Sequence, residues 1–130
     1  MTDAERLLKR TYAAFNARDI ASVLGVMHPD VDWPNGMEGG RVRGHDAVRD
    51  YWIRQWQIID PSVEPRHMTT TRDGRVDVEV HQVVRDLAGR LVKDEIVHHV
   101  YAFEAGLITS MEIETSGISR RVSRPGEESE

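Results

Sequence analysis

Three short turns divide the second half of the chain, and they constrain its fold more than any other feature. Each ends in glycine: Asp73-Gly74, Ala88-Gly89 and Ala105-Gly106. Asp-Gly is a strong hairpin signal, because its backbone angles match the twist of the flanking strands. In residues 76–81 every second residue is valine and the others are polar, which is the period of a half-buried strand. The pattern predicts antiparallel strands that include residues 63–72, 76–81, 91–103 and 107–115.

The beginning of the chain follows a helical period instead. Thr2 and Glu5 have the spacing of a capping box, and apolar positions then recur every three or four residues. Asp19 is placed to cap a short second helix, which Pro29 is expected to stop.

A third helix is predicted to begin after Gly44 and to be closed by Pro61. Before it lie a very short extended piece at residues 31–33 and a glycine-rich loop at residues 37–44. Three helices followed by a meander of strands give an α+β class. A curved sheet wrapped around helices makes a cone, whose open end is a natural ligand pocket.

Domain organisation and composition narrow the function classes. We expect one domain at residues 1–118 and a flexible, charged C-terminal tail at residues 119–130. The 130 residues carry a net charge of −5, which argues against binding to nucleic acid. There is no cysteine, so disulfides and thiolate chemistry are excluded. No apolar run is long enough for a membrane span, and the cytoplasm is the expected location.

Four motifs together resemble a known superfamily. They are residues 12–19 (YAAFNARD), residues 27–33 (MHPDVDW), residues 44–48 (GHDAV), and a last hairpin at residues 103–113 (FEAGLITSMEI). In this order and spacing they are similar to the NTF2-like fold and, within it, to the SnoaL-like group related to ketosteroid isomerases and polyketide cyclases. The resemblance covers about residues 7–115. It implies a cone of helices on a curved antiparallel or mixed sheet, and a homodimer formed through the outer sheet face.

The resemblance also shows what this chain lacks. In the register of the ketosteroid isomerases, Asn35 replaces the aspartate base, Thr11 the tyrosine and His99 the acid. An amide cannot take a proton near neutral pH, so steroid isomerisation by that mechanism is not expected. The epoxide hydrolases of this fold use an aspartate–arginine–aspartate set that orients a water. The strand positions of that set look like Val80 and Gln82 in this chain, so that reaction is not expected either.

In SnoaL-type cyclases an acidic residue on the final strand exchanges the proton, and Glu112 lies near that position. It alternates with Met111 and Ile113, which are expected to be buried. Glu112 is therefore predicted to face away from the pocket.

His98 and His99 are the main candidates for chemistry. Neighbouring side chains of a strand point to opposite faces, so only one histidine can face a cavity, and the resemblance favours His99. With an ordinary pKa of about 6.5, His99 could act as an acid–base group, or it could simply line the cavity. Asp32 could orient His99 or act as a base; alternatively it is a solvated carboxylate in a turn.

The remaining candidates would hold the substrate. Gln82 interrupts a row of valines and needs a polar partner, which could be His99, a ligand or water. The aromatic residues could line a pocket for a flat apolar ligand, or could be plain core. The predicted substrate-binding residues are Thr11, Tyr12, Phe15, Trp33, Asn35, Trp52, Trp56, Gln82, Tyr101 and Phe103.

Two main functions remain open at this point. The first is a cofactor-independent isomerase, cyclase or dehydratase that moves protons on a small apolar carbonyl compound. The second is a non-catalytic module that binds a ligand or a protein; a weaker third option makes the dimer surface the working part. No metal is expected, because the six histidines have no ligand spacing, and no organic cofactor is implied.

Overall fold

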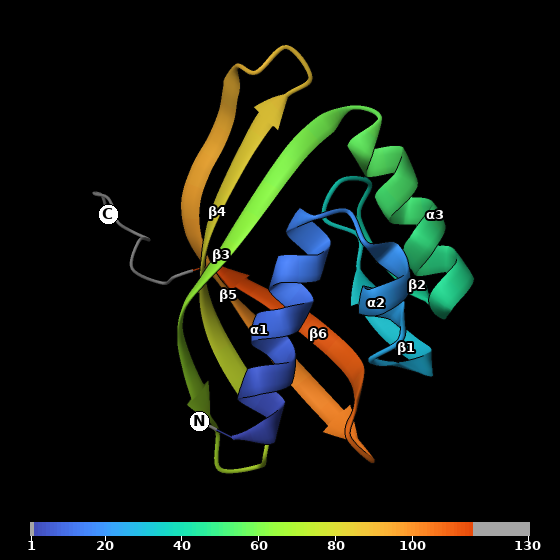
Figure 1. Ribbon diagram of the computed structural model, residues 1–130, viewed down its shortest axis with the longest axis vertical. Helices are drawn as coiled ribbons and strands as arrows, with labels where there is room; N and C mark the ends of the chain where they lie inside the picture. Colours follow the sequence, from blue (N-terminus) through green and yellow to red (C-terminus); the bar gives the residue numbers. More distant parts are fainter. Residues whose placement is uncertain (1, 116–130) are drawn as a thin grey trace.

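The computed structural model describes residues 2–115, which form three helices and one sheet of six strands (Figure 1). The predicted boundary at residue 118 and the predicted tail at residues 119–130 lie outside the described residues. The elements in chain order are α1 (Asp3–Asn16), α2 (Ile20–Leu24), β1 (Met27–Pro34), β2 (Arg41–Arg43), α3 (His45–Trp56), β3 (Ile59–Thr70), β4 (Val76–Asp86), β5 (Leu91–Glu104) and β6 (Leu107–Thr115).

The first two helices begin at the caps that the sequence predicted. The Thr2 hydroxyl accepts the Glu5 backbone N–H, and the Glu5 carboxylate accepts the Thr2 backbone N–H, so the capping box is complete. At α2, the Asp19 carboxylate accepts the backbone N–H of Ser22. These bonds satisfy N–H groups that a helix leaves unpaired in its first turn.

The sheet has the order β2-β1-β6-β5-β4-β3. Strands β3 to β6 form the predicted antiparallel meander, and β1 is parallel to β6, which makes the sheet mixed. Gly74, Gly89 and Gly106 have φ angles between 81° and 89°, so each predicted turn has a residue suited to the left-handed region. The expected α+β class and mixed, cone-like sheet are confirmed.

Two predicted boundaries are wrong, and strand pairing explains both. The second helix ends at Leu24 rather than Pro29, because Met27 already begins β1 opposite Ile108 of β6. The third helix ends at Trp56 rather than Pro61, which pairs with Val84 inside β3. Proline is tolerated there because β3 is an edge strand, whose outward N–H groups need no sheet partner.

The predicted loop at residues 37–44 also contains a short strand, β2. It pairs with β1, with Trp33 opposite Val42. A strand of three residues between glycines is too short for an alternation of polar and apolar residues to be recognised from the sequence.

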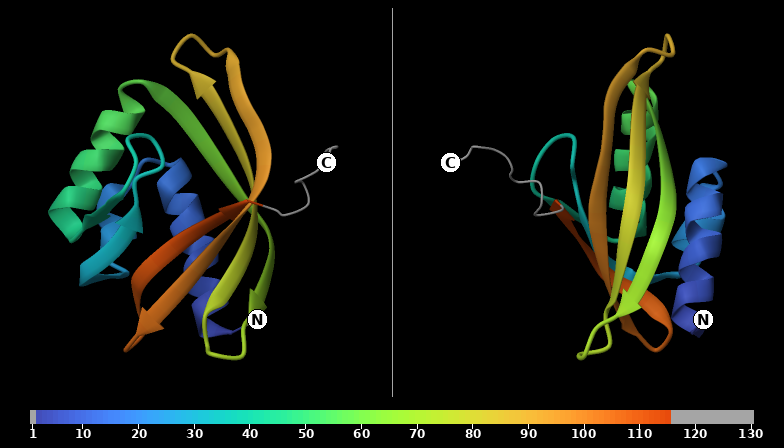
Figure 2. Two further views of the ribbon diagram at one scale, coloured as in Figure 1. Left: turned by 180° about the vertical axis from the view of Figure 1, so that it is seen from behind. Right: turned by 90° about the vertical axis from the view of Figure 1, so that its left-hand side faces the viewer.

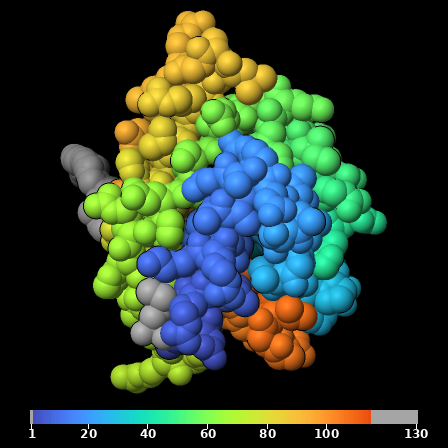
Figure 3. All heavy atoms as spheres, viewed as in Figure 1, coloured from blue at the N-terminus to red at the C-terminus, as the bar shows by residue number. Residues whose placement is uncertain are grey.

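The helices cover one face of the sheet (Figures 2 and 3). The hydrophobic core is made of residues from the helices and from this face of the sheet. Val76, Val78 and Val80 are at most 1% exposed and point to this inner face, as their alternation predicted. Leu8 of α1 and Val48 of α3 are completely buried against it. None of the helices within residues 2–115 has the length and apolar character needed to cross a membrane.

Candidate functional site

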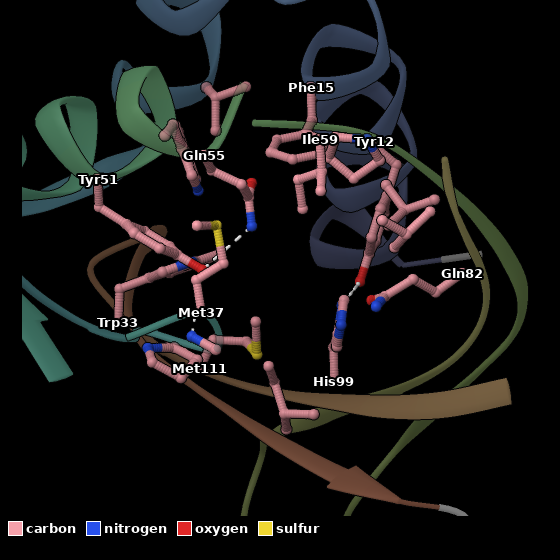
Figure 4. Close-up of a pocket in the computed structure, with 18 of the residues that line it drawn as sticks. Tyr12, Phe15, Trp33, Met37, Tyr51, Gln55, Ile59, Gln82, His99 and Met111 are labelled. Carbon is pink, nitrogen blue, oxygen red and sulfur yellow. Dashed lines mark hydrogen bonds between the residues drawn. The ribbon is translucent and has the colours of Figure 1, made fainter. Parts of the chain in front are cut away.

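A pocket of about 260 Å³ lies between α1, α3 and the inner face of the sheet (Figure 4). Its walls are largely apolar. Phe15 and Trp33 both pack edge-on against Trp52, with ring centroids 5.4 and 5.7 Å from it. A concave, mainly apolar site with a few polar groups is the usual form of a small-molecule pocket.

Most of the residues that the sequence predicted for the site line this pocket. Helix α1 contributes three, α3 one, and the strands the others. The predicted residues that line it are Thr11, Tyr12, Phe15, Trp33, Trp52, Gln82, His99 and Tyr101.

The main polar feature of the pocket is a buried chain of three side chains. The Tyr101 hydroxyl donates to the Tyr12 hydroxyl oxygen at 2.8 Å, and Tyr12 Oη lies 2.8 Å from His99 Nδ1. Each of the three residues is at most 6% exposed. Strand alternation places His99 and Tyr101 on one face of β5, and Tyr12 meets them from α1.

Burial determines the charge of these three side chains. It lowers the pKa of His99 to about 4, with a smaller contribution from the neighbouring His98. Burial also raises the pKa values of Tyr12 and Tyr101 well above the usual 10. All three groups are therefore neutral at pH 7, and the expectation that His99 titrates near 6.5 is not met.

The hydrogen-bond directions then assign the His99 tautomer. With the Tyr101 hydroxyl donating to Tyr12, the Tyr12 hydrogen is placed to donate to His99 Nδ1, and this arrangement corresponds to the tautomer with the ring proton on Nε2. Within residues 2–115 no group bonds Nε2, which is left available to a ligand. His99 thus offers the pocket an N–H donor rather than a basic nitrogen.

Gln82 and Thr11 line the pocket with their polar groups already engaged. The Gln82 side-chain N–H₂ donates to Glu95 at 3.4 Å, so its partner within the protein is Glu95 and not His99. The Thr11 hydroxyl donates to the Leu7 carbonyl of its own helix at 2.7 Å. Neither residue contributes a charge to the pocket.

Asp32 does not reach the pocket. Its carboxylate accepts from Arg41 Nε at 2.8 Å, and the same guanidinium donates to Glu112 at 3.0 Å. The cluster ties β1, β2 and β6 together on the exposed side of the sheet. Asp32 therefore neither orients His99 nor acts as a base on a bound molecule, and Glu112 faces away as predicted.

Three other predicted residues do not line the pocket and make contacts elsewhere in the structure. Asn35 closes its own loop, since its side chain both donates to and accepts from Glu38. Trp56 stacks on Trp52, and the Arg18 guanidinium lies 4.9 Å from its ring centroid. Phe103 packs against the core without lining the cavity.

The sequence analysis missed a second wall of the pocket. Tyr51 and Gln55 of α3 line it, and Met37 reaches it from the loop between β1 and β2. The Tyr51 hydroxyl accepts the Gly36 backbone N–H at 3.1 Å. Tyr51 and Gln55 are four residues apart, the spacing of one helix face, and that pairing could have revealed them.

No carboxylate lines the pocket in the part of the chain that is described. Nor does that part contain a cluster of three or more His, Asp or Glu side chains suited to a metal ion. The arrangement can bind an apolar molecule and donate hydrogen bonds to it.

Known structures share this fold over nearly the whole chain. A structure of TerC co-crystallised with polyporic acid is 27% identical, with a TM-score of 0.77 and coverage of 92% of this chain and 95% of the other. An NTF2-like protein of unknown function from Burkholderia pseudomallei K96243 is also 27% identical, with a TM-score of 0.78 and the same coverages. A predicted polyketide cyclase from Pseudomonas putida KT2440 shares the fold at 19% identity, with a TM-score of 0.76 and coverages of 89% and 93%.

No curated protein sequence matches the chain significantly. The profile of the SnoaL-like domain family matches residues 8–111, which span the helices, the pocket and most of the sheet. The matched region includes the Tyr101–Tyr12–His99 chain. This protein therefore belongs to the SnoaL-like domain family and has an NTF2-like fold.

Proposed function

We propose that this protein binds a small, largely apolar organic molecule whose carbonyl oxygen accepts a hydrogen bond from His99 Nε2–H. The observation that carries the proposal is a neutral, oriented histidine in a pocket lined mainly by aromatic and aliphatic side chains. A donor in such surroundings favours a ligand that supplies an acceptor, because an unpaired buried polar group is unfavourable. The co-crystal structure of TerC with polyporic acid supports an organic ligand for this fold at 27% identity.

The test compares two molecules that differ only in the carbonyl group. The bicyclic ketone 1-tetralone and its hydrocarbon parent tetralin are titrated into the protein, and the dissociation constants are measured by calorimetry. One hydrogen bond from a buried donor is expected to favour the ketone by roughly fivefold to tenfold. Equal affinities, or no binding of either molecule, would overturn the proposal.

The variant His99→Phe keeps a ring of similar size and removes the donor. It should bind tetralin about as well as the wild type does and lose the preference for the ketone. A preference that survives in His99→Phe would assign the carbonyl to a different donor.

The same geometry supports a catalytic form of this function. A hydrogen bond from His99 would stabilise negative charge on the carbonyl oxygen as a proton leaves the adjacent carbon, as in isomerisation, cyclisation or dehydration. With no carboxylate among the described lining residues, cavity water would accept that proton. His99 would then be a hydrogen-bond donor to the enolate and not the base.

Proton exchange tests the catalytic form directly. In deuterated water, the wild type should exchange the hydrogens beside the carbonyl of 1-tetralone faster than His99→Phe does, as followed by NMR. Equal exchange rates would leave a protein that binds ligand without catalysing proton transfer.

The homodimer is a further part of the proposal. Ile96 is 36% exposed on the outer face of β5, and His81 and Val83 share that face of β4. Light scattering should give twice the chain mass of 14.8 kDa, and a result near 15 kDa would contradict the dimer.

A further inference from the structure

We propose that Gln55 is a second polar anchor of the pocket, and that the ligand is an apolar ring system with hydrogen-bond acceptors on two opposite edges, as in a cyclic dione or quinone. This inference rests on the proposed function, because it assumes that His99 binds the first acceptor. Gln55 would determine specificity for the second.

The first observation is an unpaired buried atom. One end of the Gln55 amide lies 3.1 Å from Tyr51 Oη, and the amide atom at the other end is buried with no partner among residues 2–115. Gln55 also lines the pocket. Buried side-chain polar atoms are almost always hydrogen-bonded, so this one marks a place that a ligand can satisfy.

The hydrogen bonds at Tyr51 indicate which amide atom is unpaired. The Gly36 backbone N–H donates to Tyr51 Oη at 3.1 Å, and an amide N–H of Gln55 at the same distance would occupy the second lone pair and leave the hydroxyl hydrogen without an acceptor among residues 2–115. The Tyr51 hydroxyl hydrogen therefore needs an acceptor, and the oxygen of the Gln55 amide is the group beside it. A half-turn of the amide exchanges Oε1 and Nε2 without moving any other atom.

In the turned arrangement every group around Tyr51 is satisfied. The Tyr51 hydroxyl donates to Gln55 Oε1, and Gln55 Nε2–H₂ takes the unpaired place. The Gln55 amide on α3 then offers the pocket an N–H donor in addition to His99 on β5.

The position of the two donors defines the ligand class. Figure 4 shows Gln55 and His99 on different walls, with Trp33 on a third side of the space between them. Phe15 and Trp52 complete the aromatic surroundings. A ligand that satisfies both donors needs an apolar ring in the middle and an acceptor at each end.

The experiment compares 1,4-naphthoquinone with 1-tetralone, which has the same carbon skeleton, one carbonyl group fewer and a saturated C2–C3 bond. Calorimetry on the full chain should show that the quinone binds about tenfold more tightly. The chain has no cysteine to add to the quinone, and an intact-mass measurement of the recovered protein checks for lysine adducts.

Two matched variants test whether Gln55 causes the preference for the quinone. Gln55→Met keeps the length of the side chain, removes the amide, and should reduce the quinone to the affinity of the monoketone. Gln57→Met changes an exposed glutamine of the same region and should leave the preference intact.

The outcomes separate the two proposals. If tetralone binds better than tetralin but the quinone binds no better than tetralone, the second anchor is overturned and the proposed function stands. A quinone preference that persists in Gln55→Met also overturns it. If none of the three molecules binds, both proposals fail together.

Discussion

His98 and His99 are neighbours in the chain, yet they lie in two different chemical environments. His99 faces the pocket, is 6% exposed, and bonds through Nδ1 to a neutral tyrosine hydroxyl. His98 faces the other side of β5, where its Nδ1 lies 2.7 Å from the Asp77 carboxylate. Strand alternation alone produces this difference, because it turns consecutive side chains to opposite faces of the sheet.

The same division holds for the charges of the two faces. The register of β4, β5 and β6 places Asp77, Glu79, Asp94, Glu112 and Glu114 on the outer face with His98. Around His99 the inner face has valine, aromatic rings and neutral hydrogen-bonding groups, and its charged residues Lys93 and Glu95 lie farther along β5 toward Leu91. The pocket is therefore suited to chemistry by oriented donors, which act strongly where water is excluded, rather than by charged residues.

The largest expected effect concerns pH and the inner histidine. The folded protein holds the pKa of His99 at about 4, whereas in the unfolded chain it is about 6.5. Between these values the unfolded chain binds a proton that the folded protein does not, so the free energy of unfolding falls as the pH drops from 6.5 to 4. The full loss from this group is about 3 kcal/mol, measured by urea unfolding across this range.

Two variants test whether His99 on the inner face causes this fall in the free energy of unfolding. His99→Phe should show a shallower decline with falling pH, whatever its stability at pH 7, because it has no group to protonate there. His98→Gln should keep most of the decline, because His98 makes only the smaller contribution to the lowered pKa of His99. Parallel curves for the wild type and His99→Phe would show that His99 is not held neutral by burial.

The next largest effect on the free energy of unfolding is expected for the Tyr12 hydroxyl, which lies between Tyr101 and His99 in the buried hydrogen-bonded series. Tyr12→Phe leaves both the Tyr101 hydroxyl and His99 Nδ1 without a partner, and should cost about 2 kcal/mol of unfolding free energy at pH 7. Tyr101→Phe removes only the end of the chain and should cost about 1 kcal/mol. Equal losses in urea unfolding would contradict a linear chain with Tyr12 in the middle.

The sequence was sufficient for features that depend on local pattern. Alternation placed Val76, Val78 and Val80 on one face and put His98 and His99 on opposite faces, and three glycine turns located the hairpins of the sheet. The capping box at Thr2 and the cap at Asp19 are also local, since each bond joins residues three positions apart. These elements need no knowledge of how the sheet is assembled.

The features that were missed depend on long-range pairing. Asp32 lies next to Trp33, but its side chain is held outside the pocket by Arg41, which also binds Glu112 of another strand. Gln55 joins the pocket through Tyr51, whose hydroxyl bonds the loop after β1. Helical spacing places Tyr51 and Gln55 on one face of α3, but no spacing rule encodes the bonds of Tyr51 to Gly36 or of Arg41 to Glu112, because these join segments that are distant in the sequence.

The smallest effect is expected on the outer face, where the structure also contains a short histidine–carboxylate contact. The Asp77 and His98 side chains are 34% and 29% exposed, so water screens their interaction and competes for both groups. Asp77→Asn should change the unfolding free energy at pH 7 by no more than about 0.5 kcal/mol. A loss as large as that of Tyr12→Phe would mean that the exposed contact on the outer face stabilises the protein as much as the buried hydrogen bonds of the inner face do. A small loss would show that, at similar bond lengths, burial determines which histidine contributes most to stability.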